Sequence, residues 1–178
     1  NTAPCYECYF CAKQEYSLCR DLQFLNGSFS EYIKIPARIV KHNLWKIPQQ
    51  LDPKEAAATQ TLAVALHGLD KSNIRSDDTI AILGLGAIGQ SFIKLAKHRN
   101  IKVAALGRSP AKLELARANG ADYIIDISQC FDDEELNAEK LTKLWEARFY
   151  QEAPYGPDKV IEAVGKLDSW KAAIALVR

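Results

Sequence analysis

The chain has 178 residues, of which 48% are hydrophobic and 25% are charged, and its formal net charge is +1. This composition is typical of a globular chain with one large domain, or with one domain and part of a second, and it excludes intrinsic disorder. The near-neutral charge provides no attraction to nucleic acid or to an anionic membrane, so we expect neither as a partner.

Two further features of the whole sequence bear on its class. It has no apolar run of about 18 residues and no internal repeat, so we expect a cytoplasmic protein. Methionine is absent, and the chain begins at Asn1 directly before a cysteine-rich segment. We therefore expect a fragment of a longer protein.

Four of the five cysteines form the pattern C-x2-C-x2-C-x7-C, made by Cys5, Cys8, Cys11 and Cys19. Four thiolates on a short loop can close a tetrahedral shell around Zn²⁺ and leave no open position for a substrate. The pattern predicts a structural zinc site, with a disulfide pair or an iron site as alternatives. The fifth cysteine, Cys130, stands alone, and we expect it to be a loop or packing residue rather than a nucleophile.

Two short strands and a helix are expected next. Residues 29–35 alternate apolar and polar side chains, which is typical of a half-buried strand, and Pro36 would end it. A second strand is expected at 44–47. Asp52 and Pro53 then supply a helix cap and a first-turn proline for a helix over 55–69. We place the domain boundary in this helix, which gives domains 1–55 and 56–178.

The rest of the chain alternates strands with helices. Such alternation with apolar strands predicts an α/β fold, a doubly wound parallel sheet covered by helices on both faces. A full dinucleotide-binding fold has six strands, so the expected sheet of about four strands is incomplete. We expect the acidic run 132–135 to lie at the start of a helix, where the dipole favours it, with a carboxylate pair for acid–base chemistry as the alternative. The expected strands are 80–83, 101–106, 122–126 and 159–163, and the expected helices are 87–98, 110–119, 137–147 and 168–177.

The stretch from Thr79 to Arg108 indicates a dinucleotide site. Its G-x-G-x-x-G pattern, formed by Gly84, Gly86 and Gly89, follows a predicted strand and opens a predicted helix, which is the context that the motif requires. The first glycine permits the tight turn, the second lets the backbone approach a pyrophosphate, and the third lets helix and strand pack closely. An ordinary strand–turn–helix joint without a ligand is the alternative.

The end of the second strand favours NADP(H) over NAD(H). NAD sites usually carry an acidic residue there for the ribose hydroxyls, whereas NADP sites carry an arginine for the 2′-phosphate. This chain has Gly107, Arg108 and Ser109. Arg108 can pair with a phosphate through its forked guanidinium, and Ser109 can donate a further hydrogen bond. The alternative for Arg108 is a solvated loop charge.

Taken together, the chain resembles the zinc-containing medium-chain dehydrogenases of the alcohol and polyol dehydrogenase group. The resemblance rests on the four-cysteine segment, on NGSFSEY at 26–32, and on GLGAIG at 84–89 followed by KLELAR at 112–117 and GAD at 120–122. IEAVG at 161–165 is similar to the family's fourth strand and its turn over the cofactor. The resemblance covers essentially the whole chain.

The resemblance implies a Rossmann-type cofactor domain preceded by part of a GroES-like β catalytic domain that carries the zinc lobe. It implies an oxidoreductase that transfers hydride between NADP(H) and an alcohol, polyol or sugar and its carbonyl form, with a zinc ion polarising the oxygen. The intact protein would act on a small-molecule substrate as a homo-oligomer. The implied cofactor contacts are Gly84, Gly86, Ala87, Ile88, Gly89, Gly107, Arg108, Ser109, Lys112 and Val164.

One position departs from the family pattern. In the family, most ligands of the catalytic zinc lie upstream of the cysteine lobe. The remaining ligand lies in a region that, in polyol dehydrogenases, contains a Glu-Pro pair before a leucine. This chain has Gln60 and Thr61 at that pair. A neutral amide is a poorer Zn²⁺ ligand than a carboxylate, so Gln60 is only a weak catalytic candidate, and a contact to substrate or cofactor, or no role at all, is an alternative.

Two other functions remain open at this point. One is a non-catalytic NADP-binding sensor or regulatory module with the same fold. The other is a zinc-independent quinone or enoyl reductase, which is less expected because such relatives generally lack the cysteine lobe. For the 178-residue chain by itself, we expect at most one zinc ion, held by the four cysteines, and little or no turnover.

Overall fold

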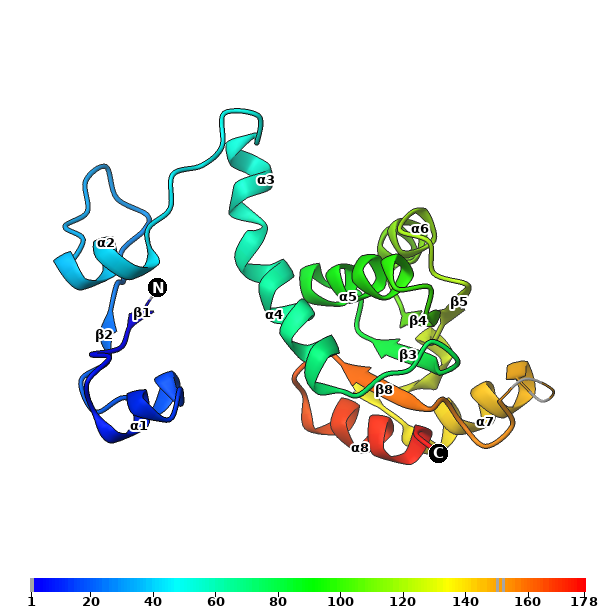
Figure 1. Ribbon diagram of the computed structural model, residues 1–178. Coiled ribbons are helices and arrows are strands. Elements are labelled where there is room, and N and C mark those ends of the chain that lie inside the picture. The colour runs from blue at the N-terminus through cyan, green and yellow to red at the C-terminus, as the bar shows by residue number, and fades with distance from the viewer. Residues whose placement is uncertain (1, 150, 152) are drawn as a thin grey trace. The chain divides into compact units, whose positions relative to one another are not determined.

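The computed structural model describes residues 2–149, 151 and 153–178. Contacts divide the chain into two compact units, one from Asn1 to Pro53 and one from Lys54 to Arg178 (Figure 1). Each unit is described by itself. Within the described residues, no helix combines the length and the apolar character needed to cross a lipid bilayer.

The first unit is built from short elements. Strand β1 (Thr2–Ala3) pairs antiparallel with β2 (Gln23–Phe24), and between them lie helix α1 (Tyr9–Ala12) and the 3-10 turn η1 (Tyr16–Leu18). Helix α2 (Ala37–Asn43) follows and packs against β1. The cysteine-bearing segment therefore lies between two paired strands.

The strands predicted at 29–35 and 44–47 are wrong. Neither segment forms a strand, and Pro36 precedes helix α2 instead of ending a strand. An alternating pattern becomes a strand only where a neighbouring strand pairs with its backbone and a surface covers its apolar side. Neither segment belongs to any sheet, and no surface covers the apolar side chains Phe29 and Tyr32, which are almost completely exposed, Tyr32 at 92%.

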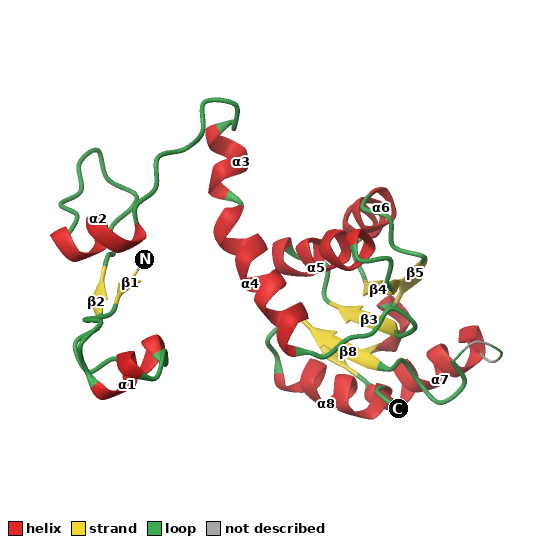
Figure 2. Ribbon diagram, viewed as in Figure 1, coloured by secondary structure: helices red, strands yellow, loops and turns green. Residues whose placement is uncertain are grey.

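The second unit contains a four-stranded parallel sheet in the order β5-β4-β3-β8. Its strands are β3 (Thr79–Leu83), β4 (Lys102–Gly107), β5 (Tyr123–Asp126) and β8 (Lys159–Glu162). Helices cover both faces (Figure 2), which confirms the predicted doubly wound α/β fold. The helices that pack on the sheet are α4 (Thr59–Lys71), α5 (Ala87–His98), α6 (Pro110–Ala118), α7 (Ala138–Phe149) and α8 (Leu167–Leu176), and α3 (Pro53–Ala57), which precedes α4, has no buried residue.

Alternating side chains of the central strand fill two apolar clusters. Ile80 and Ile82 of β3 point into a cluster with residues of α4, α5 and α6. Ala81 and Leu83 point to the opposite face, into a cluster with residues of α7 and α8. Both faces of the sheet are therefore buried, which explains why the strand sequence is continuously apolar rather than alternating.

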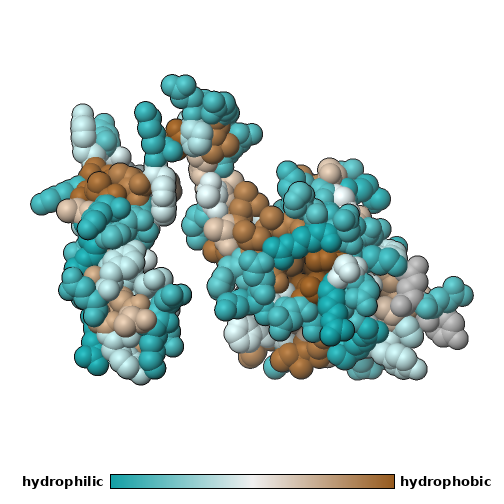
Figure 3. All heavy atoms as spheres, in the orientation of Figure 1, coloured by the Kyte–Doolittle hydropathy of each residue, from teal (hydrophilic) through white to brown (hydrophobic). Residues whose placement is uncertain are grey.

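Helix α8 leaves an apolar stripe uncovered. Leu167, Trp170 and Ile174 are spaced three and four residues apart, so they share one helix face, and they are 70%, 59% and 75% exposed. Hydrophobic atoms are visible at the position of α8 in Figure 3. The opposite face of α8, with Ala172 and Leu176, packs into the core.

The acidic run 132–135 does not open a helix, so that prediction is wrong. It forms a hairpin between β6 (Phe131–Asp132) and β7 (Glu135–Leu136), in which Asp133 adopts a left-handed φ of 54°. Helix α7 begins after it at Ala138, and the side-chain oxygen of Asn137 accepts the N–H of Lys140 at 3.0 Å. Asn137 thus caps the start of α7 by accepting a first-turn N–H, at the place where the acidic residues were expected to stabilise the helix.

Candidate zinc lobe and dinucleotide site

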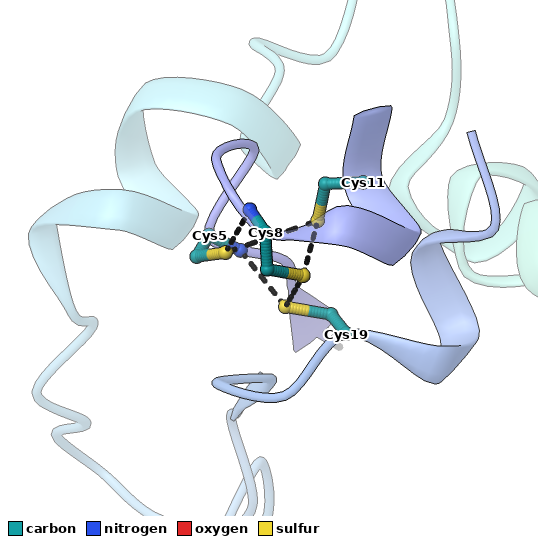
Figure 4. Close-up of side chains that lie close together, drawn as sticks. All are labelled: Cys5, Cys8, Cys11 and Cys19. Atoms are coloured by element: carbon teal, nitrogen blue, oxygen red, sulfur yellow. Dashed lines mark hydrogen bonds between the residues drawn. The ribbon is translucent and has the colours of Figure 1, made fainter. Parts of the chain in front are cut away.

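The four cysteines of the first unit converge on one point (Figure 4). Their Sγ atoms all lie within 4.8 Å of one another. Individual separations are 3.6 Å between Cys8 and Cys11, 3.9 Å between Cys5 and Cys11, and 4.0 Å between Cys8 and Cys19. Tetrahedral Zn²⁺ with Zn–S bonds of about 2.3 Å places sulfurs about 3.8 Å apart. The spacing fits a four-thiolate metal site and is far too long for a disulfide.

Backbone N–H groups point at these sulfurs. The N–H groups of Glu7 and Cys8 donate to the Cys5 sulfur at 3.4 and 3.3 Å, and the N–H of Cys5 donates to the Cys19 sulfur at 3.2 Å. Hydrogen bonds from Glu7 and Cys8 lower the pKa of Cys5, and the backbone of Arg20 lowers the pKa of Cys8 to about 6. Such bonds favour the thiolates of Cys5 and Cys8, the form that binds metal, whereas burial raises the pKa of the Cys11 thiol to about 12.

The fifth cysteine has a different environment. Cys130 lies in the 3-10 turn η2 (Ser128–Cys130) and is buried in the cluster that faces α7 and α8. Burial raises the pKa of its thiol, which makes it a poor nucleophile. The structure thus makes Cys130 a packing residue.

In the second unit, the three glycines of the G-x-G-x-x-G motif differ in the space around them. Gly84 has a left-handed φ of 99°, and a Cβ there would lie 2.6 Å from Val164. A Cβ on Gly89 would lie 2.0 Å from the Gly84 carbonyl oxygen, so helix α5 packs as closely as backbone allows. A Cβ on Gly86 would meet nothing within 4 Å. The space beside Gly86 is the space a pyrophosphate would approach.

A cavity of about 320 Å³ opens at the carboxyl ends of β3, β4 and β8. Ligands of open α/β sheets bind at such ends, where the first turn and the helix amino terminus face them. The cavity holds both charge signs, with Arg108, Lys112 and Lys166 against Glu134 and Asp168. Its other lining residues are Leu83, Gly84, Leu85, Gly86, Leu106, Gly107, Ser109, Ile127, Phe131, Leu136, Ala163, Val164 and Ser169.

The predicted cofactor residues occupy this cavity unevenly. Ala87, Ile88 and Gly89 belong to the first turn of α5 and do not line it, and Gly89 instead packs under the Gly84 carbonyl. Gln60 is exposed near the start of α4 and does not line it either. The predicted residues that do line it are Gly84, Gly86, Gly107, Arg108, Ser109, Lys112 and Val164.

Arg108 and Ser109 lie where β4 gives way to α6. The Arg108 guanidinium lies 4.9 Å from the centroid of the Phe131 ring on the β6–β7 hairpin. Ser109 is the N-cap residue of α6, yet its hydroxyl makes no capping hydrogen bond. Gln90, buried in α5, donates to the Lys112 carbonyl and accepts from the Asn119 side chain, both at 2.9 Å, so α6 is tied to α5.

Sequence reasoning missed Glu162, at the end of β8. One of its carboxylate oxygens accepts the N–H groups of Val164 and Gly165 at 2.8 and 2.9 Å, and the Ser169 hydroxyl lies 2.8 Å away. A carboxylate with several donors is a rigid anchor for a turn. Glu162 therefore shapes the turn that walls the cavity opposite Arg108. The available signal was an acidic residue at the end of an otherwise apolar strand.

The fold and these two sites define a class: a Rossmann-like parallel sheet with a dinucleotide-type glycine turn, accompanied by a cysteine lobe of zinc geometry. Comparison with protein families agrees. Residues 87–178 match the family model described as zinc-binding dehydrogenase. The chain therefore belongs to the zinc-binding dehydrogenase family.

Individual curated proteins similar to this chain are also dehydrogenases. Erythritol/L-threitol dehydrogenase of Mycolicibacterium smegmatis is 31% identical over 98% of this chain and 46% of its own length. Sorbitol dehydrogenase of Halalkalibacterium halodurans is 30% identical over 98% of this chain and 48% of its own length. The chain thus spans about half the length of the curated relatives it matches.

Two solved structures carry different cofactors on this fold. A putative zinc-binding dehydrogenase from Sinorhizobium meliloti, bound to NADP, matches with a TM-score of 0.80 and 31% identity, over 99% of this chain and 49% of that one. The rspB alcohol dehydrogenase from Escherichia coli, complexed with NADH, matches with a TM-score of 0.77 and 26% identity, over 99% and 49%. Cofactor choice therefore varies among proteins similar to this chain.

Proposed function

We propose that this chain binds NADP(H) and forms part of an oxidoreductase that transfers hydride between that cofactor and an alcohol, polyol or sugar and its carbonyl form. The observation that carries the proposal is the cavity with the glycine turn on one side and Arg108 with Ser109 on the other. The substrate class is supported by relatives named as polyol dehydrogenases.

Each wall of the cavity has a stated task in this proposal. The open side of Gly86 and the amino terminus of α5 receive the pyrophosphate, because first-turn N–H groups lack partners within a helix. Arg108, Ser109 and Lys112 receive the 2′-phosphate. No carboxylate stands at the end of β4 to repel it, since that strand ends at Gly107. The bound nicotinamide supplies or accepts the hydride.

The cysteine lobe has a structural task. Four protein sulfurs fill a tetrahedral zinc shell, so such an ion has no position for a substrate oxygen. Within the described residues, the four cysteines are the one cluster of His, Cys, Asp and Glu side chains with metal-binding spacing. Zinc-assisted catalysis would need a second ion, which would act as a Lewis acid on the substrate oxygen.

Cofactor titrations of the 178-residue chain and its Arg108→Ala variant test the NADP(H) preference. We expect the wild type to bind NADPH more tightly than NADH, and Arg108→Ala to weaken NADPH by about ten- to a hundred-fold, because a charged hydrogen-bonding partner contributes about 1.5–3 kcal/mol. NADH binding should stay within about two-fold, a change of about 0.4 kcal/mol. Quenching of protein fluorescence or isothermal titration measures both constants.

Arg117→Ala is the matched control for lost positive charge. Arg117 lies on the same helix α6, is exposed, and pairs with Glu114 outside the cavity. Its removal should leave both cofactor affinities unchanged. Tighter NADH than NADPH binding by the wild type, with unchanged NADPH affinity in Arg108→Ala, would reject the NADP(H) assignment.

A second candidate function is a cofactor-binding sensor without catalysis. The specific observation in its favour is Gln60, an exposed amide at the position where the family resemblance implies a metal-ligand region. Zinc analysis of the intact protein separates the two functions. Two zinc ions per chain support the enzyme, and one supports the sensor or a zinc-independent reductase.

A further inference from the structure

We propose that Phe131, on the β6–β7 hairpin, is a positioning residue that holds the Arg108 guanidinium ready for the 2′-phosphate, so that the hairpin is a second determinant of cofactor preference. This inference rests on the proposed binding of NADP(H). The inference goes beyond the proposed function because it adds the β6–β7 hairpin to the glycine turn and the end of β4, which carry the proposed cofactor contacts.

The Arg108 guanidinium lies over the Phe131 ring. The Arg108 carbon Cζ lies 4.9 Å from the centre of the Phe131 ring, within the range of a cation–π interaction. A cation–π contact engages the positive charge of the guanidinium and leaves its edge N–H donors available to an oxygen acceptor. Those edge donors are the groups that bind phosphate in a bidentate manner.

The Arg108 side chain is not engaged elsewhere. Among the described residues, no carboxylate lies within ion-pair distance of it, and no hydrogen bond from its guanidinium is formed. An exposed arginine without a partner has about 2 kcal/mol of rotamer entropy to lose on binding a ligand. A ring that already restricts the guanidinium lowers that cost.

The hairpin holds the ring in place independently of any ligand. The N–H of Leu136 donates to the Asp168 carboxylate at 2.7 Å, and the N–H of Asn137 donates to the Cys130 carbonyl at 2.8 Å. The Asp132 carboxylate binds both the Asn137 amide, at 2.6 Å, and the Lys140 ammonium.

The inner face of the hairpin is also packed. Phe131 is half-buried and packs against the apolar cluster that contains Cys130 and Leu136. The ring is therefore fixed to the core on one side and presents its other side to Arg108. A fixed ring can orient a flexible arginine, whereas a flexible ring could not.

Replacing Phe131 by Leu removes the aromatic face and keeps an apolar side chain for the core. In NADPH titrations of the 178-residue chain, we expect Phe131→Leu to weaken binding about two- to five-fold, the size of an exposed cation–π interaction. NADH affinity should fall less than NADPH affinity, because NADH lacks the 2′-phosphate that Arg108 receives. Phe131→Tyr keeps a ring and should restore NADPH affinity. Combined with Arg108→Ala, Phe131→Leu should cause no further loss.

Three outcomes would overturn the inference. They are equal losses of NADPH and NADH affinity in Phe131→Leu, unchanged NADPH affinity in that variant, and additive losses in the double variant. Arg108→Ala alone separates this failure from failure of the proposed function. A selective effect of Arg108→Ala without one of Phe131→Leu rejects only the role of the ring, whereas a non-selective Arg108→Ala rejects the NADP(H) assignment itself.

Folding is checked for each variant by circular dichroism and thermal unfolding. Phe131→Met replaces Phe131→Leu if the latter does not fold. Methionine adapts to irregular core gaps, and it also lacks the aromatic face that contacts the Arg108 guanidinium. The prediction for its selectivity between NADPH and NADH is the same.

Discussion

The two units of this chain are held together by different means. In the second unit, two apolar clusters lie on opposite faces of the sheet and bury whole strands and helix faces. Among the described residues of the first unit, the buried hydrophobic side chains are few, namely Ala3, Cys11, Cys19 and Ile39. Two of these are metal-site cysteines. The second unit is stabilised by its apolar core, whereas we expect the first unit to depend on a metal ion that its four cysteines could hold.

Both units expose large apolar side chains, but these make up a larger share of the residues in the first unit. The first unit exposes large apolar side chains, among them Phe29, Tyr32 and Trp45. Its size is also in the range where apolar burial alone gives marginal stability. Removing the metal should therefore have a large effect on one unit and almost none on the other.

Zinc removal is the prediction with the largest expected effect. Chelation should unfold the first unit, because structural zinc contributes about 10 kcal/mol or more to small metal-dependent folds. The sheet unit should keep its structure. Hydrogen exchange read by mass spectrometry measures both units in one experiment: amides around Cys5 to Cys19 should lose protection, and amides of β3 and β4 should keep it.

Cysteine variants provide the matched comparison for chelation. Cys11→Ser should lose zinc and reproduce the exchange pattern of the chelated protein, since Cys11 is a buried member of the cluster. Cys130→Ala removes a buried cysteine of the other unit and should keep the full zinc content. If the amides of the first unit stay protected from exchange after complete zinc loss, the first unit does not depend on the metal for its stability.

Two glycine variants come next in size and separate stability from binding within the second unit. Gly89→Ala would place its Cβ 2.0 Å from a backbone oxygen, so we expect destabilisation of about 3 kcal/mol or more. Gly86→Ala meets open space at an ordinary φ of −76°. It should leave the free energy of unfolding equal or up to about 1 kcal/mol higher.

Cofactor affinity should instead be strongly reduced in Gly86→Ala, the variant with little effect on stability. Gly86→Ala fills the space through which a pyrophosphate would approach, so NADPH binding should weaken at least about ten-fold, or about 1.4 kcal/mol, in a protein that remains folded. Urea unfolding and fluorescence titration give the two quantities. Normal NADPH affinity in Gly86→Ala would contradict the placement of the pyrophosphate at this turn.

The sheet was predictable because its signals are local and redundant. Apolar strands, glycine turn and helix agree over Thr79 to Leu106, and the structure places β3, α5 and β4 there. The strand predicted at 29–35 failed because alternation describes only the segment itself and contains no information about a pairing partner. The cysteine cluster was predictable from spacing, since four ligands so close in sequence can hardly avoid meeting in space.

The missing part of the candidate site is the hairpin. Residues 131–136 lack a glycine or an Asn-Gly pair, the usual sequence signals of a tight hairpin, and the turn instead uses Asp133 at positive φ. Four acidic residues before a helical pattern suggested a helix start. As a result, Phe131 was not expected near Arg108, although both line the same cavity.

The smallest predicted effect concerns the attachment of the β6–β7 hairpin to helix α8. The Asp168 carboxylate accepts the Leu136 N–H at 2.7 Å, and that bond lowers the pKa of Asp168. In Asp168→Asn an amide oxygen can still accept the bond, but without charge. We therefore expect a loss of only about 1 kcal/mol of stability at neutral pH.

The sign of the pH dependence follows from the direction of that shift. A carboxyl group with a lowered pKa in the folded protein stabilises it above the unfolded value of about 3.9, and this contribution is lost as the pH falls through the folded pKa. The difference in unfolding free energy between wild type and Asp168→Asn should therefore shrink when the pH is lowered from neutral to below about 3.9. Urea unfolding at a series of pH values measures it. A difference that stays constant with pH would mean that the carboxylate charge does not secure the hairpin, and that apolar packing of Phe131 and Leu136 alone attaches it to the core.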